Sequence, residues 1–216
     1  MVSLLGKNDA KPFSVDRGRL CQIPTPKPTL SWCPLPHSRL MDSVEGQLRK
    51  RGYRVHDSTC LLTHGGNRFL GTVSISNREN LGYRRMIGAR NSHDKSLAAG
   101  LVAGAKVVVC SNGWFFGDEI ALSRKHTSRL FEDLDERIEA GFSRIFEEWE
   151  RNDLRVMNYR EKQLDDKEAH DLVIKSVDAE ALAPSAIPKV LREWREPWHS
   201  EFVPRNAWSL FNGFTE

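Results

Sequence analysis

The sequence predicts an α+β protein in which an antiparallel, glycine-bent β-sheet in residues 53–120 packs with an N-terminal helix and a C-terminal helical region. Between residues 53 and 92, short runs of alternating apolar and polar residues are separated by glycine- and asparagine-containing turns, a pattern typical of β-hairpins. From residue 127 onward, apolar residues instead recur every three or four positions, as in amphipathic helices. With 39% hydrophobic residues and six tryptophans, the chain can bury a substantial core.

The chain of 216 residues fits one domain preceded by an arm. Residues 1–36 are predicted to form an irregular arm, because the five prolines between residues 24 and 36 favour extended backbone. Residues 37–216 are predicted to form a single α+β domain, with the sheet in 53–120 and the helical region in 127–216.

A helix is expected from about Ser38 to Arg51 at the start of this domain. Leu40, Val44 and Leu48 lie four positions apart and therefore share one face of such a helix. Gly52 follows a basic last turn and suits the left-handed residue that ends many helices.

After this helix the apolar period changes to two, which favours an antiparallel meander. The predicted strands cover residues 53–62, 68–76, 83–92 and 97–110. The segment His64-Gly65-Gly66-Asn67 is a hairpin turn, since glycine and asparagine accept positive φ at little cost. The first part of the last strand could instead form a short helix, but Gly100 and Gly104 favour a strand with bends or close backbone approaches.

The helical region begins with a long apolar stripe, for which Thr127 or Ser128 can supply the cap. The stripe consists of Leu130, Leu134, Ile138, Phe142, Ile145, Phe146 and Trp149. Further helical segments are expected at 165–178, before Trp194 and at 206–214. Because the pattern reaches Glu216 without a helix stop, we expect the natural C-terminal region to continue further.

A polar loop, Asn91 to Ser96, lies between two predicted strands and is the first candidate site. If the protein is an enzyme, His93 can act as acid or base, with Asp94 or Cys110 in support. The alternative is a structural turn, since Asn, Ser and Asp side chains often bond nearby backbone. The residues of the surrounding motif assigned to such a structural role are Ser92, Ser96, Asn112 and Gly113.

Charge is distributed unevenly along the chain. Residues 1–110 carry 17 Lys+Arg and 7 Asp+Glu, whereas residues 111–216 carry 15 and 22, so that halves of +10 and −7 give the net charge of +3. Either the basic half faces an anionic partner, or the two halves neutralise each other. For the first alternative, the predicted nucleic-acid contacts are Arg84, Arg85, Arg90, Asn91 and Lys95, next to aromatic residues on which bases could stack.

The sequence predicts no cofactor and no metal site. The segment ending in Lys95-Ser96 has Asp94 where a phosphate-binding loop requires glycine. The four cysteines are far apart and form no Cys-x-x-Cys pair, so zinc-ribbon and thioredoxin motifs are absent. No apolar run approaches the ~18 residues of a membrane span, and the N-terminus lacks a signal-peptide pattern. We therefore expect a cytoplasmic protein without a membrane partner.

Three separated motifs resemble one known family. They are Arg90 to Ser96, Val109 to Gly113, and the late segment from Asn206 to Glu216. Over roughly residues 40–216 the chain resembles the phage/plasmid-like family known as domain of unknown function 932. The resemblance implies a bacterial mobile element or prophage setting, in which DNA recombination, repair or protection are plausible roles, and it implies no established activity.

The leading function prediction is a non-catalytic nucleic-acid-binding protein, with DNA the favoured partner. An enzyme acting on a nucleotide or phosphoester through the His93 loop is the first alternative. A host-directed interaction protein, with the acidic helix at 130–150 as its contact face, is the second. Homo-oligomerisation is also left open.

Overall fold

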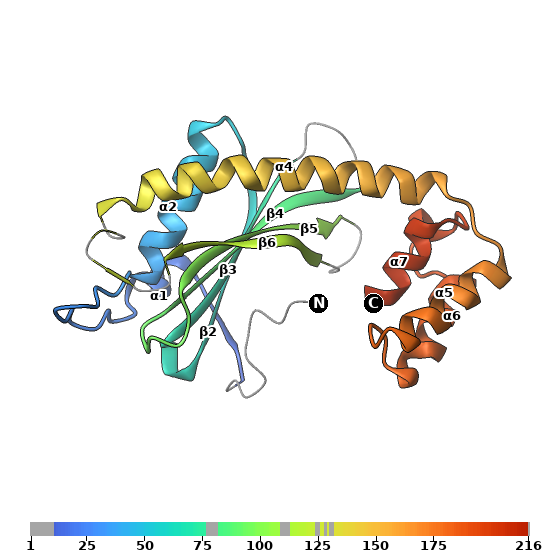
Figure 1. Cartoon of the computed structure of the whole chain (residues 1–216), viewed down its shortest axis with the longest axis horizontal. Coiled ribbons are helices and arrows are strands. Elements are labelled where there is room, and N and C mark those ends of the chain that lie inside the picture. The colour runs from blue at the N-terminus through green and yellow to red at the C-terminus, as the bar shows by residue number, and fades with distance from the viewer. Residues whose placement is uncertain are drawn as a thin grey trace. The chain divides into compact units, whose positions relative to one another are not determined.

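Figure 1 shows the computed structural model of the chain, which describes residues 11–76, 82–108, 113–123, 126–127, 129 and 132–215. The chain forms two compact units. The first, here called the sheet unit, comprises residues 1–108 and 114–149. The second, the C-terminal unit, comprises residues 109–113 and 150–216.

The sheet unit contains a six-stranded sheet in which neighbouring strands are also consecutive in sequence. The strands are β1 (Phe13–Val15), β2 (Val55–Thr63), β3 (Arg68–Ile75), β4 (Tyr83–Ser92), β5 (Ala99–Val107) and β6 (Gly113–Ser123). The pairs from β1 through β5 are antiparallel. The predicted α+β class and antiparallel meander are therefore confirmed, and residues 99–107 form a strand rather than a helix. The strong twist of the sheet is visible in Figure 1.

The predicted hairpin between β2 and β3 is present as a short 3₁₀ turn, η1 (His64–Gly66). Gly65 and Gly66 have φ values of 66° and 94°, a region that favours glycine. The turn brings Thr63 opposite Arg68, and this pair starts the ladder between the two strands.

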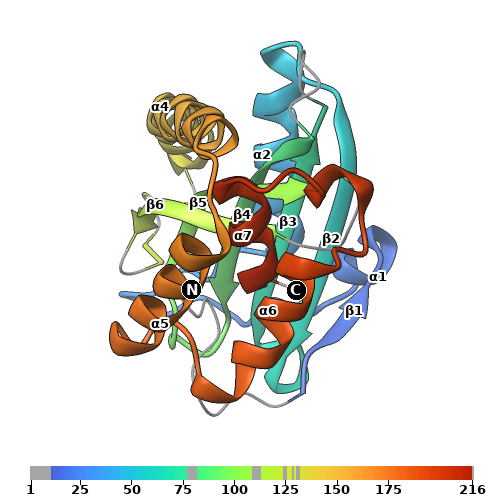
Figure 2. The ribbon, with the colours of Figure 1, turned by 90° about the vertical axis from the view of Figure 1, so that its right-hand side faces the viewer.

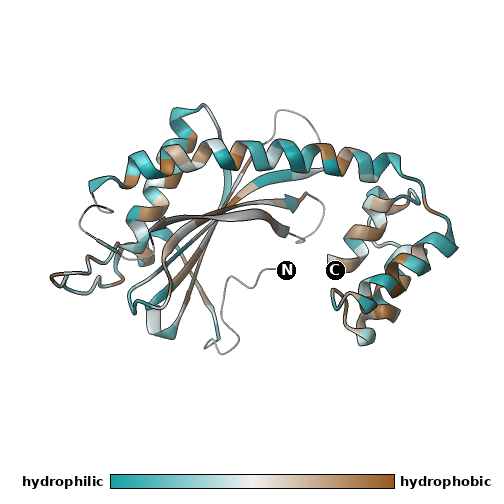
Figure 3. Ribbon diagram, viewed as in Figure 1, coloured by the Kyte–Doolittle hydropathy of each residue, from teal (hydrophilic) through white to brown (hydrophobic). Residues whose placement is uncertain are grey.

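Helix α2 (His37–Lys50) forms where the apolar stripe predicted it and lies alongside the sheet (Figure 2). Leu40, Val44 and Leu48 are fully buried. Apolar and polar residues alternate along α2 and α4 in Figure 3, as expected for amphipathic helices. Gly52 follows the helix with a φ of 75°, which supports its predicted role as the stop residue.

The arm contains two short elements in a segment that was predicted to be irregular. Strand β1 pairs with the edge of β2, with Phe13 opposite Leu62 and Val15 opposite Cys60. Helix α1 (Arg17–Cys21) follows, and the Asp16 carboxylate caps it by accepting from the backbone N–H of Arg19 at 2.7 Å. The open edge of β2 supplies hydrogen-bonding partners that a proline-rich segment by itself lacks.

Helix α4 (Leu134–Glu161) begins later than the predicted cap at Thr127 and extends well beyond Trp149. Of the predicted stripe, Leu130 lies outside the described residues, Phe146 is half-buried, and Leu134, Ile138, Phe142, Ile145 and Trp149 are fully buried. The indole N–H of Trp149 donates to the carbonyls of Met86 (3.2 Å) and Gly104 (3.1 Å), which are opposite each other in β4 and β5. This residue therefore joins the helix to the centre of the sheet.

The C-terminal unit is helical and has its own core. It contains α5 (Asp166–Asp178), η2 (Pro184–Ala186), α6 (Ile187–Arg195), η3 (Ser200–Phe202) and α7 (Ala207–Thr215). The core consists of Leu164, Ala169, Val173, Leu182, Val190, Trp194 and Leu210. Helix α5 starts at a capping box formed by Asp165 and Glu168, close to its predicted start. No helix in the described ranges is both long enough and apolar enough to pass through a bilayer.

Candidate functional site

The two faces of the sheet differ in what lies on them. Directly opposed residues of neighbouring strands share a face, so the register sorts each strand residue to one side. One face packs against α2 and α4 and includes Val73, Ile87, Ala89 and Leu101, all buried. The opposite face, which we call the basic face, carries Arg68, Arg84, Arg90 and Lys106, all half-buried.

Strand alternation separates the arginines that were predicted to act together. Arg84 and Arg90 are six positions apart in β4 and therefore lie on the same face, the basic face. Arg85 lies on the helix-covered face, where its guanidinium is 5.6 Å from the ring centre of Trp149. Asn91 also lies on that side and is fully buried. Neither Arg85 nor Asn91 is placed to meet a phosphate together with Arg84 and Arg90.

The basic face holds like charges close together. Arg84 is directly opposite Lys106, an arrangement that is unfavourable in a sheet. Lys106 forms an ion pair with Asp57 of β2 at 3.4 Å, although β3 and β4 lie between their strands, so the sheet is strongly curled on this side. Arg68 forms an ion pair with Asp94 at 2.9 Å. An anion bound between these cations would reduce their mutual repulsion.

Phe115 of β6 lies over two glycines of the same face. A Cβ atom built on Gly88 would be 2.6 Å from the ring of Phe115, and one on Gly104 would be 2.8 Å from it. Only glycine therefore leaves room for this ring, which agrees with the close approach predicted at Gly104. Phe115 is half-buried. Phe115 was not among the predicted site residues. The aromatic segment Trp114-Phe115-Phe116, which follows the two strand glycines in the sequence, could have indicated a ring packed on the sheet.

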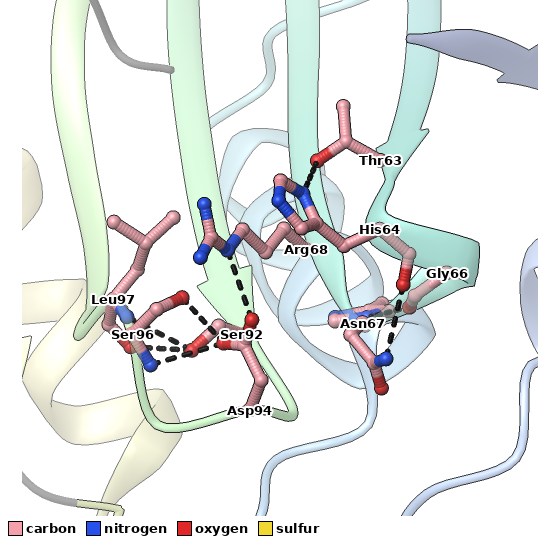
Figure 4. Close-up of polar contacts among 10 residues, drawn as sticks. Thr63, His64, Gly66, Asn67, Arg68, Ser92, Asp94, Ser96 and Leu97 are labelled. Atoms are coloured by element: carbon pink, nitrogen blue, oxygen red, sulfur yellow. Dashed lines mark hydrogen bonds and ion pairs between the residues drawn. The ribbon is translucent and has the colours of Figure 1, made fainter. Parts of the chain in front are cut away.

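The polar loop after β4 is held by its own side chains (Figure 4). The Ser92 hydroxyl donates to the Leu97 carbonyl at 2.9 Å and accepts from the Leu97 N–H at 3.0 Å. One oxygen of Asp94 accepts from both the backbone N–H (3.0 Å) and the hydroxyl of Ser96. These bonds close the turn locally, as in other turns stabilised by Asp and Ser.

Ionisation of Asp94 follows from these contacts. Its partial burial raises the pKa, but the hydrogen bonds from Ser96 and the hydrogen bond and charge of Arg68 outweigh burial and lower the pKa to about 2. Asp94 is therefore a carboxylate at neutral pH and is paired with Arg68 rather than with His93.

Lys95 lies at the tip of this loop with a φ of 64°. It is exposed, and its ammonium lies 4.9 Å from the ring centre of Trp32 in the arm. The loop and the arm are thus in contact through this pair.

A buried polar cluster lies behind the loop, on the helix-covered side of the sheet. The rings of His37 and His93 are stacked, with centroids 3.8 Å apart and planes inclined by 8°. Asn91 donates from its Nδ2 to the Leu35 carbonyl (2.7 Å) and to Nδ1 of His37 (2.9 Å). His93 donates from Nε2 to the same Leu35 carbonyl at 2.9 Å.

The hydrogen bonds of this cluster define its protonation state. His37 donates from Nε2 to the Gly66 carbonyl at 3.0 Å, and its Nδ1 must accept the proton offered by Asn91. His37 is therefore neutral. Burial, together with the nearby His93, lowers its pKa to about 3. Burial likewise lowers the pKa of His93 and that of His126.

The expected catalytic arrangement does not form among the described residues. His93 is buried against His37, and its ring donates to the carbonyl of Leu35 rather than to Asp94. Cys110 lies outside the described residues, as does Asn112, whereas Gly113 is the first residue of β6. The contacts of Asn91 and His93 tie the end of β4 to the arm and to α2. Within the described ranges, no three His, Cys, Asp or Glu side chains are close enough to hold a metal ion.

Asn91 is predicted to contribute to stability through this cluster. Replacement by leucine keeps the volume but leaves Nδ1 of His37 without its donor, so we expect a loss of about 1–3 kcal/mol in the free energy of unfolding. Urea denaturation of the purified variant measures this loss. Asn158→Leu, the same substitution at an exposed position of α4, serves as the control, and equal stability of Asn91→Leu and the parent would contradict the structural role.

A family profile described as a domain of unknown function (DUF932) matches residues 40–216. The chain belongs to this family. The match covers α2 from Leu40 onward, strands β2 to β6 and the whole C-terminal unit, and it leaves outside residues 1–39, which include β1, α1 and the first turn of α2. No curated protein matches the chain, and no solved structure does. Membership in DUF932 thus establishes the family and no activity.

The late motif of the family resemblance has a structural role in the C-terminal unit. The Asn206 amide donates to the Arg160 carbonyl at 3.1 Å and accepts from the Ser209 N–H at 2.9 Å, which caps α7. Asn212 donates to the Trp208 carbonyl at 2.9 Å. These asparagines join α7 to the end of α4.

Proposed function

We propose that this protein is a non-catalytic nucleic-acid-binding protein whose basic face contacts the phosphates of a DNA strand. The observation that carries the proposal is the convergence of Arg84, Arg90 and Lys106 on one sheet face, with the half-buried ring of Phe115 between them. Cationic residues flanking an accessible aromatic ring are the combination that single-strand-binding surfaces use.

The spacing of these groups fits a polymer better than a small anion. Arg84 and Arg90 are six residues apart on one strand, which corresponds to ~20 Å along β4. A single phosphate cannot bridge that distance, whereas successive phosphates of one nucleic-acid strand can contact both guanidinium groups. Lys95 is a further exposed cation, on the loop that follows β4.

Phe115 favours single strands over duplexes. Atoms of its ring approach Gly88 and Gly104 so closely that a Cβ atom would collide with them at either position. A base can stack on the remaining ring surface only when it is not already stacked inside a duplex. Stacking is largely independent of base identity, so the surface would bind many sequences.

Membership in DUF932 does not identify a binding partner. The mobile element or prophage setting, with a role in DNA recombination, repair or protection, is therefore part of this proposal and rests on the motif resemblance alone. A surface that holds single strands without cleaving them is compatible with each of these roles.

The proposal predicts how binding depends on salt. Labelled single-stranded DNA, duplex DNA and RNA would be titrated with the full chain, and fluorescence anisotropy measured at several salt concentrations. Arg84→Ala/Arg90→Ala should weaken binding and reduce the slope of log K against log salt by about 1.4, from ~0.7 per lost phosphate contact on a single strand.

The chain offers a matched control for this charge change. Arg49→Ala/Arg144→Ala removes two exposed arginines from α2 and α4, which cover the opposite face of the sheet. We expect this control to retain the slope of the parent. Phe115→Leu should weaken single-strand binding by about 1–3 kcal/mol with the slope unchanged. Absence of binding at low salt, or equal losses in both double variants, would refute the proposal.

A further inference from the structure

A pocket of ≈ 300 Å³ lies in the C-terminal unit, apart from the residues of the basic face. It is lined by Lys189, Arg192, Glu193, Trp198 and His199. This volume lies at the lower end of the range found for small-molecule sites, ~300–1,000 Å³. Two cations, one carboxylate and two aromatic rings therefore surround one hollow.

The sequence builds this pocket from one helix and the segment that follows it. Lys189, Arg192 and Glu193 lie at positions i, i+3 and i+4 of α6 and so share one face of the helix. The opposite side of α6 contributes Val190 and Trp194 to the core. The backbone N–H of Trp198 donates to a carboxylate oxygen of Glu193 at 3.5 Å, which keeps the following segment close to the helix.

Trp198 is the unusual member of this group. It is 82% exposed, whereas Trp194 and Trp208 in the same unit are each 3% exposed. A large ring left in water forgoes the free energy of burial, ~25 cal/mol per Å² of apolar surface. The neighbouring His199 is held edge-on to Phe202, with ring centroids 5.8 Å apart, so the segment that carries Trp198 is ordered against the unit.

We propose that this pocket binds a nucleotide, with its base stacked on Trp198 and its phosphate on Lys189 and Arg192. An exposed indole offers the best stacking surface among the side chains, and two cations one helical turn apart can share one phosphate. The negative charge of Glu193 repels the phosphate and so keeps it at the other end of the pocket. Because a carboxylate only accepts hydrogen bonds, Glu193 favours a base whose edge carries an amino group. The ligand class is thus an adenine, guanine or cytosine nucleotide, free or at the end of a strand.

The test uses dAMP, deoxyadenosine and inorganic phosphate as separate probes of the full chain, with calorimetric titration as the readout. We expect dAMP to bind more tightly than either of its parts. Trp198→Leu should weaken the binding of dAMP and of deoxyadenosine by roughly 5- to 150-fold, which is the range for the loss of one base stack. The affinity for inorganic phosphate should be unchanged. Lys189→Ala/Arg192→Ala should weaken the binding of dAMP and of inorganic phosphate and leave the affinity for deoxyadenosine unchanged.

Two controls make the outcome decisive. Arg155→Ala/Lys167→Ala removes two exposed cations of the same unit outside the pocket and should bind dAMP like the parent. Arg84→Ala/Arg90→Ala should also retain dAMP binding, so failure of the basic-face proposal would not affect this result. Failure of millimolar dAMP to bind, or binding that survives both pocket variants, would overturn the inference.

Discussion

Trp149→Ala is expected to lower the free energy of unfolding by about 3–5 kcal/mol, because it removes a large aromatic side chain from the core. The side chain is fully buried beneath α4 and contacts Tyr53 and Phe146 edge-on. Its removal leaves a cavity, and the carbonyls of Met86 and Gly104 lose the indole N–H that donates to them. For a chain of this length the loss corresponds to a fall of about 6–20 °C in the melting temperature.

Urea denaturation followed by far-UV circular dichroism measures this loss. Trp149→Phe retains most of the apolar contact and removes only the hydrogen bonds, so a smaller loss of about 1–3 kcal/mol is expected. Trp198→Ala is the matched control, because Trp198 is 82% exposed and its removal should change stability by less than ~0.5 kcal/mol. Similar losses for Trp149→Ala and Trp198→Ala would show that α4 does not depend on this contact with the sheet.

Acidification is expected to destabilise the sheet unit through the buried histidines. In the folded chain the pKa of His37 is lowered to about 3, whereas an unfolded histidine has its ordinary value of 6.5. Below pH 6.5 the unfolded chain therefore binds a proton that the folded chain does not, and stability falls as the pH falls. Between about pH 7.5 and pH 4.5, His37 accounts for a loss of about 2–3 kcal/mol. The lowered pKa values of His93 and His126 act in the same direction.

His37→Phe separates this effect from general acid denaturation. Phenylalanine retains the stacking on His93 and Phe69 but cannot bind a proton. At pH 7.5 the variant should be less stable than the parent, because Gly66 and Asn91 lose their partner. As the pH is lowered, the difference between the two chains should shrink. His56→Gln, at an exposed position of β2, is the control for replacing a histidine in the same unit. A constant difference between His37→Phe and the parent would contradict a titrating His37.

Much of the fold could be predicted from local patterns. The period-two runs predicted β2, β3 and β4 nearly to the residue, because a strand with one buried face must alternate. The apolar stripe of α2 was equally informative, since the spacing of its residues is set within a few turns of chain. The arm was harder: β1 forms only because the edge of β2 is available to it, and that edge is more than 40 residues distant in sequence.

The candidate sites, too, depend partly on local sequence and partly on contacts between residues that are distant in sequence. The polar loop was identified as an important region, but its side chains bond one another, the arm and α2 rather than presenting a catalytic pair. His37 was not selected, because nothing local distinguishes a histidine at the start of a helix from one that stacks on His93 across 56 residues. Phe115 and its two glycines likewise come from three different strands.

The family, the α+β class, the order of strands β2 to β5 and the concentration of basic residues in the first half of the chain all follow from the amino-acid sequence. Which of those basic residues share a surface follows instead from the packing of the folded chain. Arg84 and Arg85 are adjacent in sequence yet lie on opposite faces of β4, one on the basic face and one against Trp149. Alternation along a strand is a local property, but which face helices cover depends on how distant segments pack, and that choice decides which cations can meet a ligand.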